Sequence, residues 1–153
     1  MKLKESTELS ASANRVWELV KLSGTLVYVS RGLLGFAGAE RFPLEWEEGM
    51  EVETRLLFLG VLPGWRHRLT FAEVDDARRT LATREEGGPV RRWNHVISVA
   101  PLDSQRCRYT DEVEIEAGPF TPFVWLFANI FYRHRQRRWR SLLERTGGLR
   151  PET

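Results

Sequence analysis

The sequence predicts one α+β domain in which a curved antiparallel sheet wraps around a long C-terminal helix. Three observations support this fold class. Between Gly38 and Glu116 apolar and polar residues alternate with a period of two, which is typical of half-buried strands. After Gly118-Pro119 the period becomes that of a helix and continues to about Arg145. Two short helical patterns precede the strands.

The first part of the chain predicts one strand and two short helices. Residues 2–9 alternate loosely and indicate a strand. Ser12 is the expected N-cap of the first helix, because a serine hydroxyl can accept a backbone N–H of the first turn. Apolar residues from Leu26 to Leu34 favour a second short helix that ends near Gly35.

Six strands follow, and short turns join them into an antiparallel meander. The predicted strands are residues 40–44, 50–59, 65–74, 79–84, 91–99 and 106–116. Pro43 confines the first of these to an edge or an end, because proline cannot donate to the ladder. With residues 2–9, the sheet has about seven strands.

The long helix has a predicted start and end. Thr121 is the expected N-cap, and Pro122 occupies the first helical position, where its missing N–H does no harm. Gly147-Gly148 ends the helix. About 24 residues would span about 36 Å, so this helix must cross the whole sheet. Helices on one side of a strongly bent sheet leave a space beneath them.

Composition limits the possible functions. A chain of 153 residues fits one domain and can bury a full core without metals or disulfides. Six Trp, eight Phe and three Tyr either fill a core or line a pocket. Cys107 is the only cysteine, which excludes an internal disulfide and argues against a zinc cluster. With no signal-peptide pattern and no apolar run near ~20 residues, we expect a cytoplasmic protein.

The order of elements and four local phrases resemble the SRPBCC superfamily, the START-like and birch-pollen-allergen-like helix-grip domains that include the polyketide cyclase/dehydrase type. The phrases are residues 13–19, 92–95, 109–113 and 131–135. The resemblance covers nearly the whole chain. It implies a single START-like ligand-binding domain, residues 1–153, with a cavity for a lipid-, quinone- or polyketide-like molecule between sheet and C-terminal helix. The superfamily shares no single catalytic motif, so the resemblance transfers no catalytic residue.

His95 and Asp111 are the most informative polar pair. A hairpin loop centred near Asp103 sets residue 95 opposite 111, 97 opposite 109 and 93 opposite 113. An adjacent carboxylate would orient the imidazole and raise its basicity. The pair can be structural, anchor a ligand or act as general acid/base with Tyr109, and it would be exposed if the register slips by one. The same face carries Trp93, Ile97, Val99, Cys107, Tyr109, Val113 and Ile115.

Two further segments supply candidate ligand contacts. The first half of the long helix carries Phe120, Phe123, Val124, Phe127, Ile130 and Phe131, followed by His134. These rings form either plain core or one wall of a cavity, and both interpretations can hold at different positions. The apolar loop from Gly60 to Trp65 is either a lid over the cavity or a dimer contact. The candidate ligand-binding residues are Trp93, His95, Ile97, Tyr109, Asp111, Val113, Phe123, Phe127, Ile130, Phe131, His134, Leu62 and Trp65.

The remaining polar residues give weaker signals. His67 alternates with Leu69 and Phe71, so it is either a second inward polar group or a strand-end histidine in solvent. The three histidines lack the short spacing of metal ligands, and we expect no metal and no cofactor. Net charge is only +2 and no recognition motif is present, so no nucleic-acid partner is expected.

A basic run occupies residues 133–140. It can be a solvated face, neutralised in part by the acidic segment 45–53, or it can contact an anionic membrane through Arg133, Arg137 and Arg140. Three function classes therefore stay open: a binding protein for a hydrophobic small molecule, which is favoured; a metal-independent cyclase or dehydratase using His95, Asp111 and Tyr109; and an interaction protein using the basic helix. The oligomeric state is also open.

Overall fold

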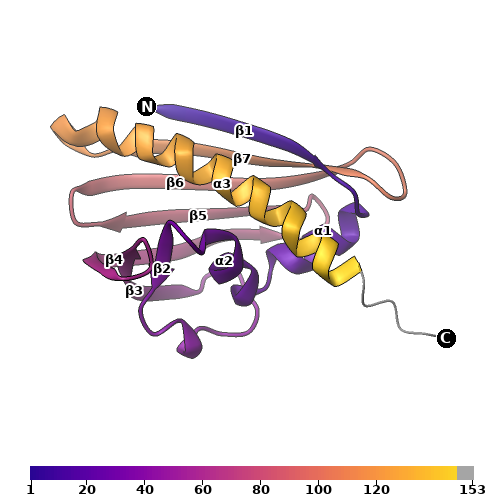
Figure 1. The fold of residues 1–153 in the computed structure, drawn as a ribbon, viewed down its shortest axis with the longest axis horizontal. Coiled ribbons are helices and arrows are strands. Elements are labelled where there is room, and N and C mark those ends of the chain that lie inside the picture. Colours follow the sequence, from indigo (N-terminus) through magenta and orange to yellow (C-terminus); the bar gives the residue numbers. More distant parts are fainter. Residues whose placement is uncertain (148–153) are drawn as a thin grey trace.

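Seven antiparallel strands form one curled sheet, and the long helix α3 lies across one of its faces (Figure 1). The computed structural model describes residues 1–147. The sheet order is β1-β7-β6-β5-β4-β3-β2, which confirms the predicted fold class. The strands are β1 (Lys2–Leu9), β2 (Leu34–Phe36), β3 (Glu51–Phe58), β4 (Leu62–Asp75), β5 (Thr80–Gly87), β6 (Val90–Pro101) and β7 (Cys107–Glu116).

The α-helices are α1 (Ala13–Val20), α2 (Ser23–Ser30) and α3 (Thr121–Gly147), and the two 3-10 turns are η1 (Ala39–Arg41) and η2 (Gly118–Phe120). Ser12 caps α1 as predicted, since its hydroxyl accepts the N–H of Arg15 at 3.2 Å. Thr121 is the first residue of α3 rather than its cap. Its hydroxyl accepts the Ala117 N–H and donates to the Gly118 carbonyl, which fixes the turn that enters the helix. Gly148, part of the predicted stop signal, lies outside the described residues.

The segment between α2 and β3 differs from the prediction. The second helix ends at Ser30, because Gly32 adopts a positive φ of 103° that breaks the helical path. Leu34 therefore belongs to the edge strand β2, which pairs with β3. The predicted strand at residues 40–44 is wrong: η1 and a loop occupy it, and Pro43 has no N–H to support a ladder there.

The β6–β7 register is shifted by two residues from the predicted one. His95 pairs with Val113, and Ile97 pairs with Asp111. The cause is the hairpin loop, which lies between the paired residues Pro101 and Cys107 and is thus centred one residue later than predicted. A shift of two leaves every side chain on the same face of the sheet. The predicted inward set therefore stays inward, although the pairing itself was wrong.

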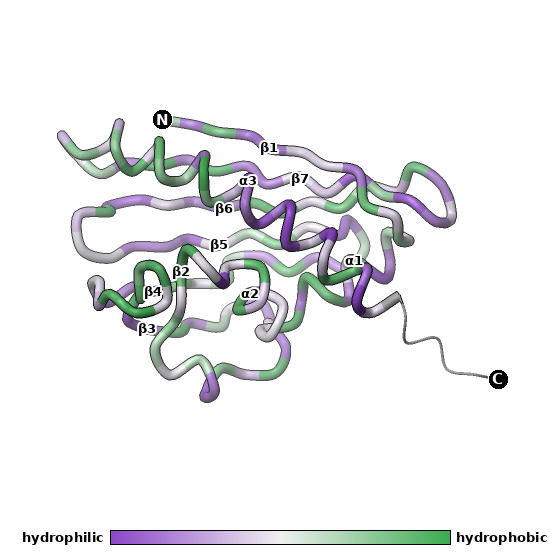
Figure 2. The backbone as a smooth tube through the Cα atoms, viewed as in Figure 1, coloured by the Kyte–Doolittle hydropathy of each residue, from purple (hydrophilic) through white to green (hydrophobic). Residues whose placement is uncertain are grey.

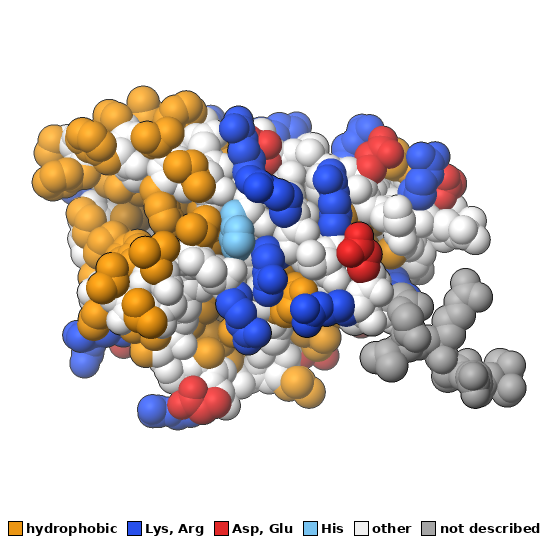
Figure 3. All heavy atoms as spheres, viewed as in Figure 1, with side chains coloured by type: hydrophobic (Ala, Val, Ile, Leu, Met, Phe, Trp, Pro, Cys, Tyr) orange, Lys and Arg blue, Asp and Glu red, His pale blue; other side chains and the backbone are white. Residues whose placement is uncertain are grey.

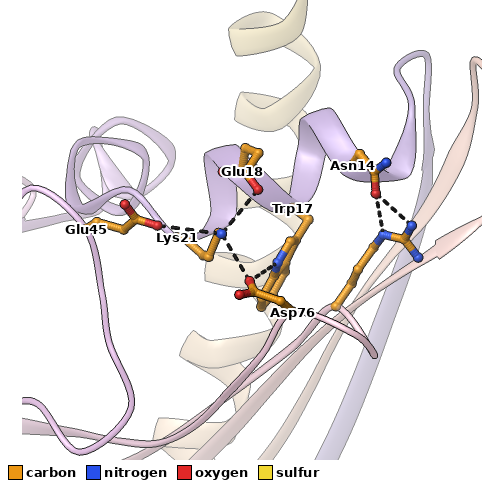
Figure 4. A network of polar contacts seen from close by, with 7 residues as sticks. Asn14, Trp17, Glu18, Lys21, Glu45 and Asp76 are labelled. Carbon is orange, nitrogen blue, oxygen red and sulfur yellow. Dashed lines mark hydrogen bonds and ion pairs between the residues drawn. The ribbon is translucent and has the colours of Figure 1, made fainter.

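A polar network attaches α1 to the turn between β4 and β5 (Figure 4). Lys21 Nζ lies 3.0 Å from Asp76, 3.2 Å from Glu18 and 3.6 Å from Glu45. The indole N–H of Trp17 donates to the same Asp76 carboxylate at 2.8 Å. Hydrogen bonds from Trp17 and Lys21 lower the pKa of Asp76 below its ordinary value. This network therefore holds α1 and the residue that follows it against the β4–β5 turn.

The acidic segment 45–53 does not neutralise the basic run as expected. Glu45 pairs with Lys21, while Glu51 and Glu53 pair with Arg68 on β4. None of these three carboxylates pairs with an α3 arginine among residues 1–147. The basic run instead bonds to its own neighbours: Arg133 to Glu5, Arg138 to the Tyr28 carbonyl and Arg140 to Thr7.

The core lies between the sheet and the helices and has two parts. Around the second half of α3, Trp139 packs on Tyr109 at a ring distance of 5.1 Å, beside Trp17 and Leu9. Around the first half, Phe131 and Tyr132 pack with side chains of β6 and β7. Within residues 1–147, no helix is long and apolar enough to cross a membrane.

Candidate functional site

A cavity of about 360 Å³ lies between the sheet and helices α2 and α3. Its volume falls in the range of small-molecule sites. Strands β2 to β6 contribute its floor, with Leu56, Phe71 and Leu81 among the lining side chains. Phe120 and Phe123 also line the cavity, yet they are 58% and 72% exposed. The cavity therefore opens to solvent beside the start of α3.

Several predicted contact residues line this cavity. They come from β4, β6 and α3, and they are Trp65, Trp93, His95, Ile97, Phe123, Phe127 and Phe131. The aromatic side chains thus have both roles that the sequence left open. Phe123 and Phe127 form part of a wall, whereas Phe131 is also buried in the core.

Other predicted contact residues lie away from the cavity. Tyr109, Asp111 and Val113 are buried on β7, but α3 packs on β1 and β7, so these side chains lie behind the lining residues. Leu62 and Ile130 are more than half exposed and do not line the cavity.

His134 is also outside the cavity. Its Nε2–H donates to the Arg31 carbonyl at 2.7 Å and ties α3 to the end of α2.

Two histidines, each paired with a carboxylate, face the cavity. His95 Nε2 lies 2.7 Å from Asp111 Oδ1, and His67 Nε2 lies 2.9 Å from Glu85 Oε2. Asp111 is fully buried and also accepts the hydroxyl of Tyr109 at 3.0 Å. The predicted His95–Asp111 contact is therefore present despite the register error, because long side chains can bridge diagonal neighbours. His67 is the inward polar group, at 6% exposure, rather than a solvent histidine.

Local partners keep both carboxyls ionised despite burial. Burial favours the neutral form of Asp111, but the hydrogen bond from His95 and the charge of Arg135 outweigh it and lower its pKa. Burial acts in the same way on Glu85, and the hydrogen bond and charge of His67 outweigh it and lower that pKa also. Burial and the charge of Asp111 together raise the pKa of the Tyr109 hydroxyl, so it stays protonated.

Arg135 is the cation of this cluster and is 5% exposed. Burial opposes its charge, but Tyr109 and Asp111 outweigh the burial and raise its pKa. Its Nη2 donates to the Tyr109 hydroxyl at 3.5 Å, and its guanidinium lies 5.3 Å from the centre of the Tyr132 ring. The expectation of a solvated basic face was wrong at this position. A buried charge of this kind persists only when other groups compensate it.

Four buried polar atoms on lining residues have no hydrogen-bond partner among residues 1–147. They are His67 Nδ1, Arg135 Nε, Trp65 Nε1 and Trp139 Nε1. His67 Nε2 bonds to Glu85, so Nδ1 is the ring nitrogen that is left without a partner. The other three atoms are N–H donors. Buried polar groups normally have partners, so these atoms indicate where a bound molecule or water would supply them.

Sequence reasoning missed Glu85, Thr83, Tyr132 and Arg135 as site residues. Two signals were available. Residues 131, 135 and 139 repeat at helical spacing, so Arg135 shares the face of Phe131 and Trp139. Thr83 and Glu85 alternate with the inward Leu81 on β5, and the Thr83 hydroxyl donates to Glu85 at 2.7 Å.

Solved structures with very low sequence identity share this fold. A START superfamily protein from Mycobacterium smegmatis is 14% identical with a TM-score of 0.73, and the match covers 95% of this chain and 98% of that one. A norcoclaurine synthase point mutant from Thalictrum flavum, in complex with a transition-state analogue, is 17% identical with a TM-score of 0.66 and 96% coverage of both chains. The di-domain ARO/CYC BexL is 14% identical with a TM-score of 0.68, over 94% of this chain and 46% of that one. The chain has the helix-grip fold that these structures share, which confirms the fold predicted from its sequence resemblance to the SRPBCC superfamily.

A match to a family profile identifies the family to which this chain belongs. The profile described as "Domain of unknown function (DUF8410)" matches residues 37–143. The chain belongs to this family. In this DUF8410 member the matched span runs from η1 through most of α3, so it includes both histidine–carboxylate pairs and Arg135. A search of the curated proteins found no match.

Proposed function

We propose that this protein binds a mainly apolar small molecule in the cavity, with an oxygen-bearing end at the buried polar cluster. The observation that carries the proposal is a cavity of about 360 Å³ with aromatic and aliphatic walls and unpartnered polar atoms of His67, Arg135 and Trp65. Ligand sites commonly combine apolar walls with a few polar groups that fix orientation. The proposal treats residues 1–153 as one cytoplasmic ligand-binding domain.

The polar atoms specify what the ligand must offer. Arg135 Nε and Trp65 Nε1 donate, so they require acceptor oxygens. A hydroxyl suits His67 Nδ1, because a hydroxyl both donates and accepts and can therefore pair with that nitrogen in either protonation state of the ring. Apolar burial would supply most of the affinity at roughly 25 cal/mol per Å². A hydroxylated polyketide-, quinone- or lipid-like compound meets these requirements.

The similar structures support a small-molecule role. One of them, norcoclaurine synthase, holds a transition-state analogue. Another is an ARO/CYC protein of the BE-7585A biosynthetic pathway. Sequence identities of 14–17% support a shared fold only, so we propose the chemistry from the residues of this cavity.

Native mass spectrometry of gently purified protein, followed by denaturing extraction, tests the proposal. We expect a co-purifying compound or uptake of an added hydroxylated aromatic probe. Trp65→Phe removes the Nε1 donor but keeps a ring, so it should weaken retention. Trp125→Phe is the matched control, because Trp125 Nε1 donates to the Lys2 carbonyl outside the cavity. A bare chain that takes up no probe would contradict binding.

A second candidate is a metal-independent cyclase or dehydratase. It is favoured by the two cavity histidines, each held by a carboxylate, and by the free Nδ1 of His67. Such an arrangement suits general base catalysis. His95 and Asp111 keep their candidate roles, whereas Tyr109 lies behind the cavity and would act only through Asp111. Conversion of a bound compound that is lost in His67→Gln, with binding retained, would support catalysis; an unchanged compound in the native protein would favour simple binding.

A further inference from the structure

The outward face of α3 changes character halfway along the helix. Six exposed residues recur at alternating spacings of three and four, which places them on one side of the helix: Phe123, Leu126, Ile130, Arg133, Arg137 and Arg140. The three apolar members are 72%, 56% and 53% exposed. Figure 2 shows the same change, from a mostly hydrophobic first half of α3 to a mostly hydrophilic second half. This outward face thus joins an apolar half to a basic half.

A second apolar segment lies across the cavity opening. The turn between β3 and β4 exposes Leu59 and Val61, at 60% and 73%, and Leu62, the first residue of β4, is 56% exposed. Leu59 holds a positive φ of 54°, which is unfavourable for leucine. The neighbouring Phe58 ring lies 6.0 Å from Phe127 of α3, so the two segments meet at the cavity. We call these exposed apolar residues of the turn and of α3 the apolar rim.

Cations lie beside the apolar rim on the same side of the molecule. Figure 3 shows hydrophobic side chains gathered at one end of this side and Lys and Arg side chains across its middle. Arg31 and Arg137 are exposed and have no acidic partner among residues 1–147, and α3 contains no acidic residue before Glu144. An apolar tip bordered by unneutralised arginines has the amphipathic pattern of a surface that binds at a lipid interface.

We propose that the apolar rim and the arginines beside it dock this protein onto an anionic lipid bilayer. The rim enters the boundary between headgroups and acyl chains, and Arg31 and Arg137 lie against lipid phosphates. A second copy of this chain fits less well, because it would have to bring acidic groups to Arg31 and Arg137. Because the cavity opens at the rim, docking would let an apolar molecule pass between bilayer and cavity without crossing water. The docking itself does not depend on which molecule the cavity holds.

Vesicle co-sedimentation with the full chain tests the proposal. We expect binding to phosphatidylcholine vesicles that contain phosphatidylglycerol, and much weaker binding to phosphatidylcholine alone. Added salt should weaken the binding, because it screens exposed charges. Binding that is equal for both vesicle types, or absent from both, would overturn the proposal.

Paired variants assign the effect to the surface. Phe123→Ser should weaken vesicle affinity about tenfold or more, and Arg137→Gln about fivefold. Leu44→Ser and Arg84→Gln are the controls, because both residues are exposed and neither belongs to the rim or to α3. Circular dichroism establishes that each variant is folded. Equal losses of vesicle affinity in the controls would contradict the proposed surface. So would a concentration-dependent dimer that Phe123→Ser dissociates while vesicle binding stays unchanged.

Discussion

The two halves of α3 carry similar aromatic side chains but have opposite environments. In the second half, Trp139 is 1% exposed and packs on Tyr109 and the α1 side of the core. In the first half, Phe123 is 72% exposed and lies at the cavity opening. The first half of α3 therefore borders the cavity opening, whereas Trp139 of the second half is buried and lines the same cavity from within.

This difference shows that aromatic content does not distinguish a filled core from a pocket wall. The position of each ring over the sheet decides it. The α3 helix packs on β1 and β7, while strands β2 to β6 lie beneath the cavity. Trp139 packs on Tyr109 of β7 and beside α1 and also lines the cavity, whereas Phe123 lies at the cavity opening and is mostly in solvent.

The largest predicted effect separates the two halves by stability. Trp139→Ala should lower the free energy of unfolding by about 3–5 kcal/mol, because it removes a large, almost fully buried side chain. Phe123→Ala should change it by about 0.5 kcal/mol or less, because that side chain is mostly in solvent. Chemical denaturation measures both values. Equal losses would mean that the first half of α3 is as closely packed as the second.

Removing the buried carboxylate of Asp111 on β7 should have the next largest effect on stability. Asp111→Asn leaves Arg135 without its compensating charge and should cost about 3 kcal/mol or more. Glu85→Gln should cost less, since the Glu85 side chain is 14% exposed and lies beside the cavity. Denaturation of the two variants under identical conditions compares them. A larger loss for Glu85→Gln would mean that the carboxylate beside the cavity contributes more to stability than the buried Asp111 does.

Stability should also depend on acid pH. The folded pKa values of Asp111 and Glu85 lie below their ordinary values of 3.8 and 4.5. Unfolded chains therefore bind protons first as pH falls, and the stabilisation that is complete at neutral pH is lost below about pH 4.5. Denaturation midpoints measured between about pH 7 and pH 3 should show this decline. The decline should be shallower in Asp111→Asn, and an identical slope would contradict the lowered pKa of Asp111.

The smallest predicted effect concerns the turn between β3 and β4. Leu62→Ser should change stability by about 0.5 kcal/mol or less, because Leu62 is more than half exposed. If the turn acts as a lid, the variant should change the rate at which an apolar probe enters the cavity. Stopped-flow fluorescence measures this rate, with Leu44→Ser as the exposed control. An unchanged entry rate would leave the turn without a gating role.

Much of the fold could be predicted from the sequence, because the period of two and the period of the helix are local signals. The hairpin register could not, since one residue of difference in the loop centre moves the pairing by two. The inward face survived because an even shift preserves it. The false strand at residues 40–44 arose from a short alternating run, and a strand there would also need a neighbour with which to pair.

The candidate site was partly predictable. Trp93, His95 and Ile97 were placed on the cavity side by alternation alone. Arg135 was grouped with its charged neighbours, although its helical spacing from Phe131 indicated burial. The position at which α3 crosses the sheet decides which inward residues reach the cavity. A local sequence pattern does not contain this information. Tyr109 and Val113 were therefore assigned to a wall that α3 covers.

The proposed function requires that the space between β2–β6 and α3 be a ligand cavity. The most direct test is fluorescence titration with an apolar naphthalene probe, comparing the native protein with Leu56→Trp. Leu56 is buried and lines the cavity, so an indole there would occupy the space. We expect saturable binding of one probe per chain in the native protein, and loss of that binding in a folded Leu56→Trp variant. Equal binding in both proteins, or none in the native protein, would contradict it.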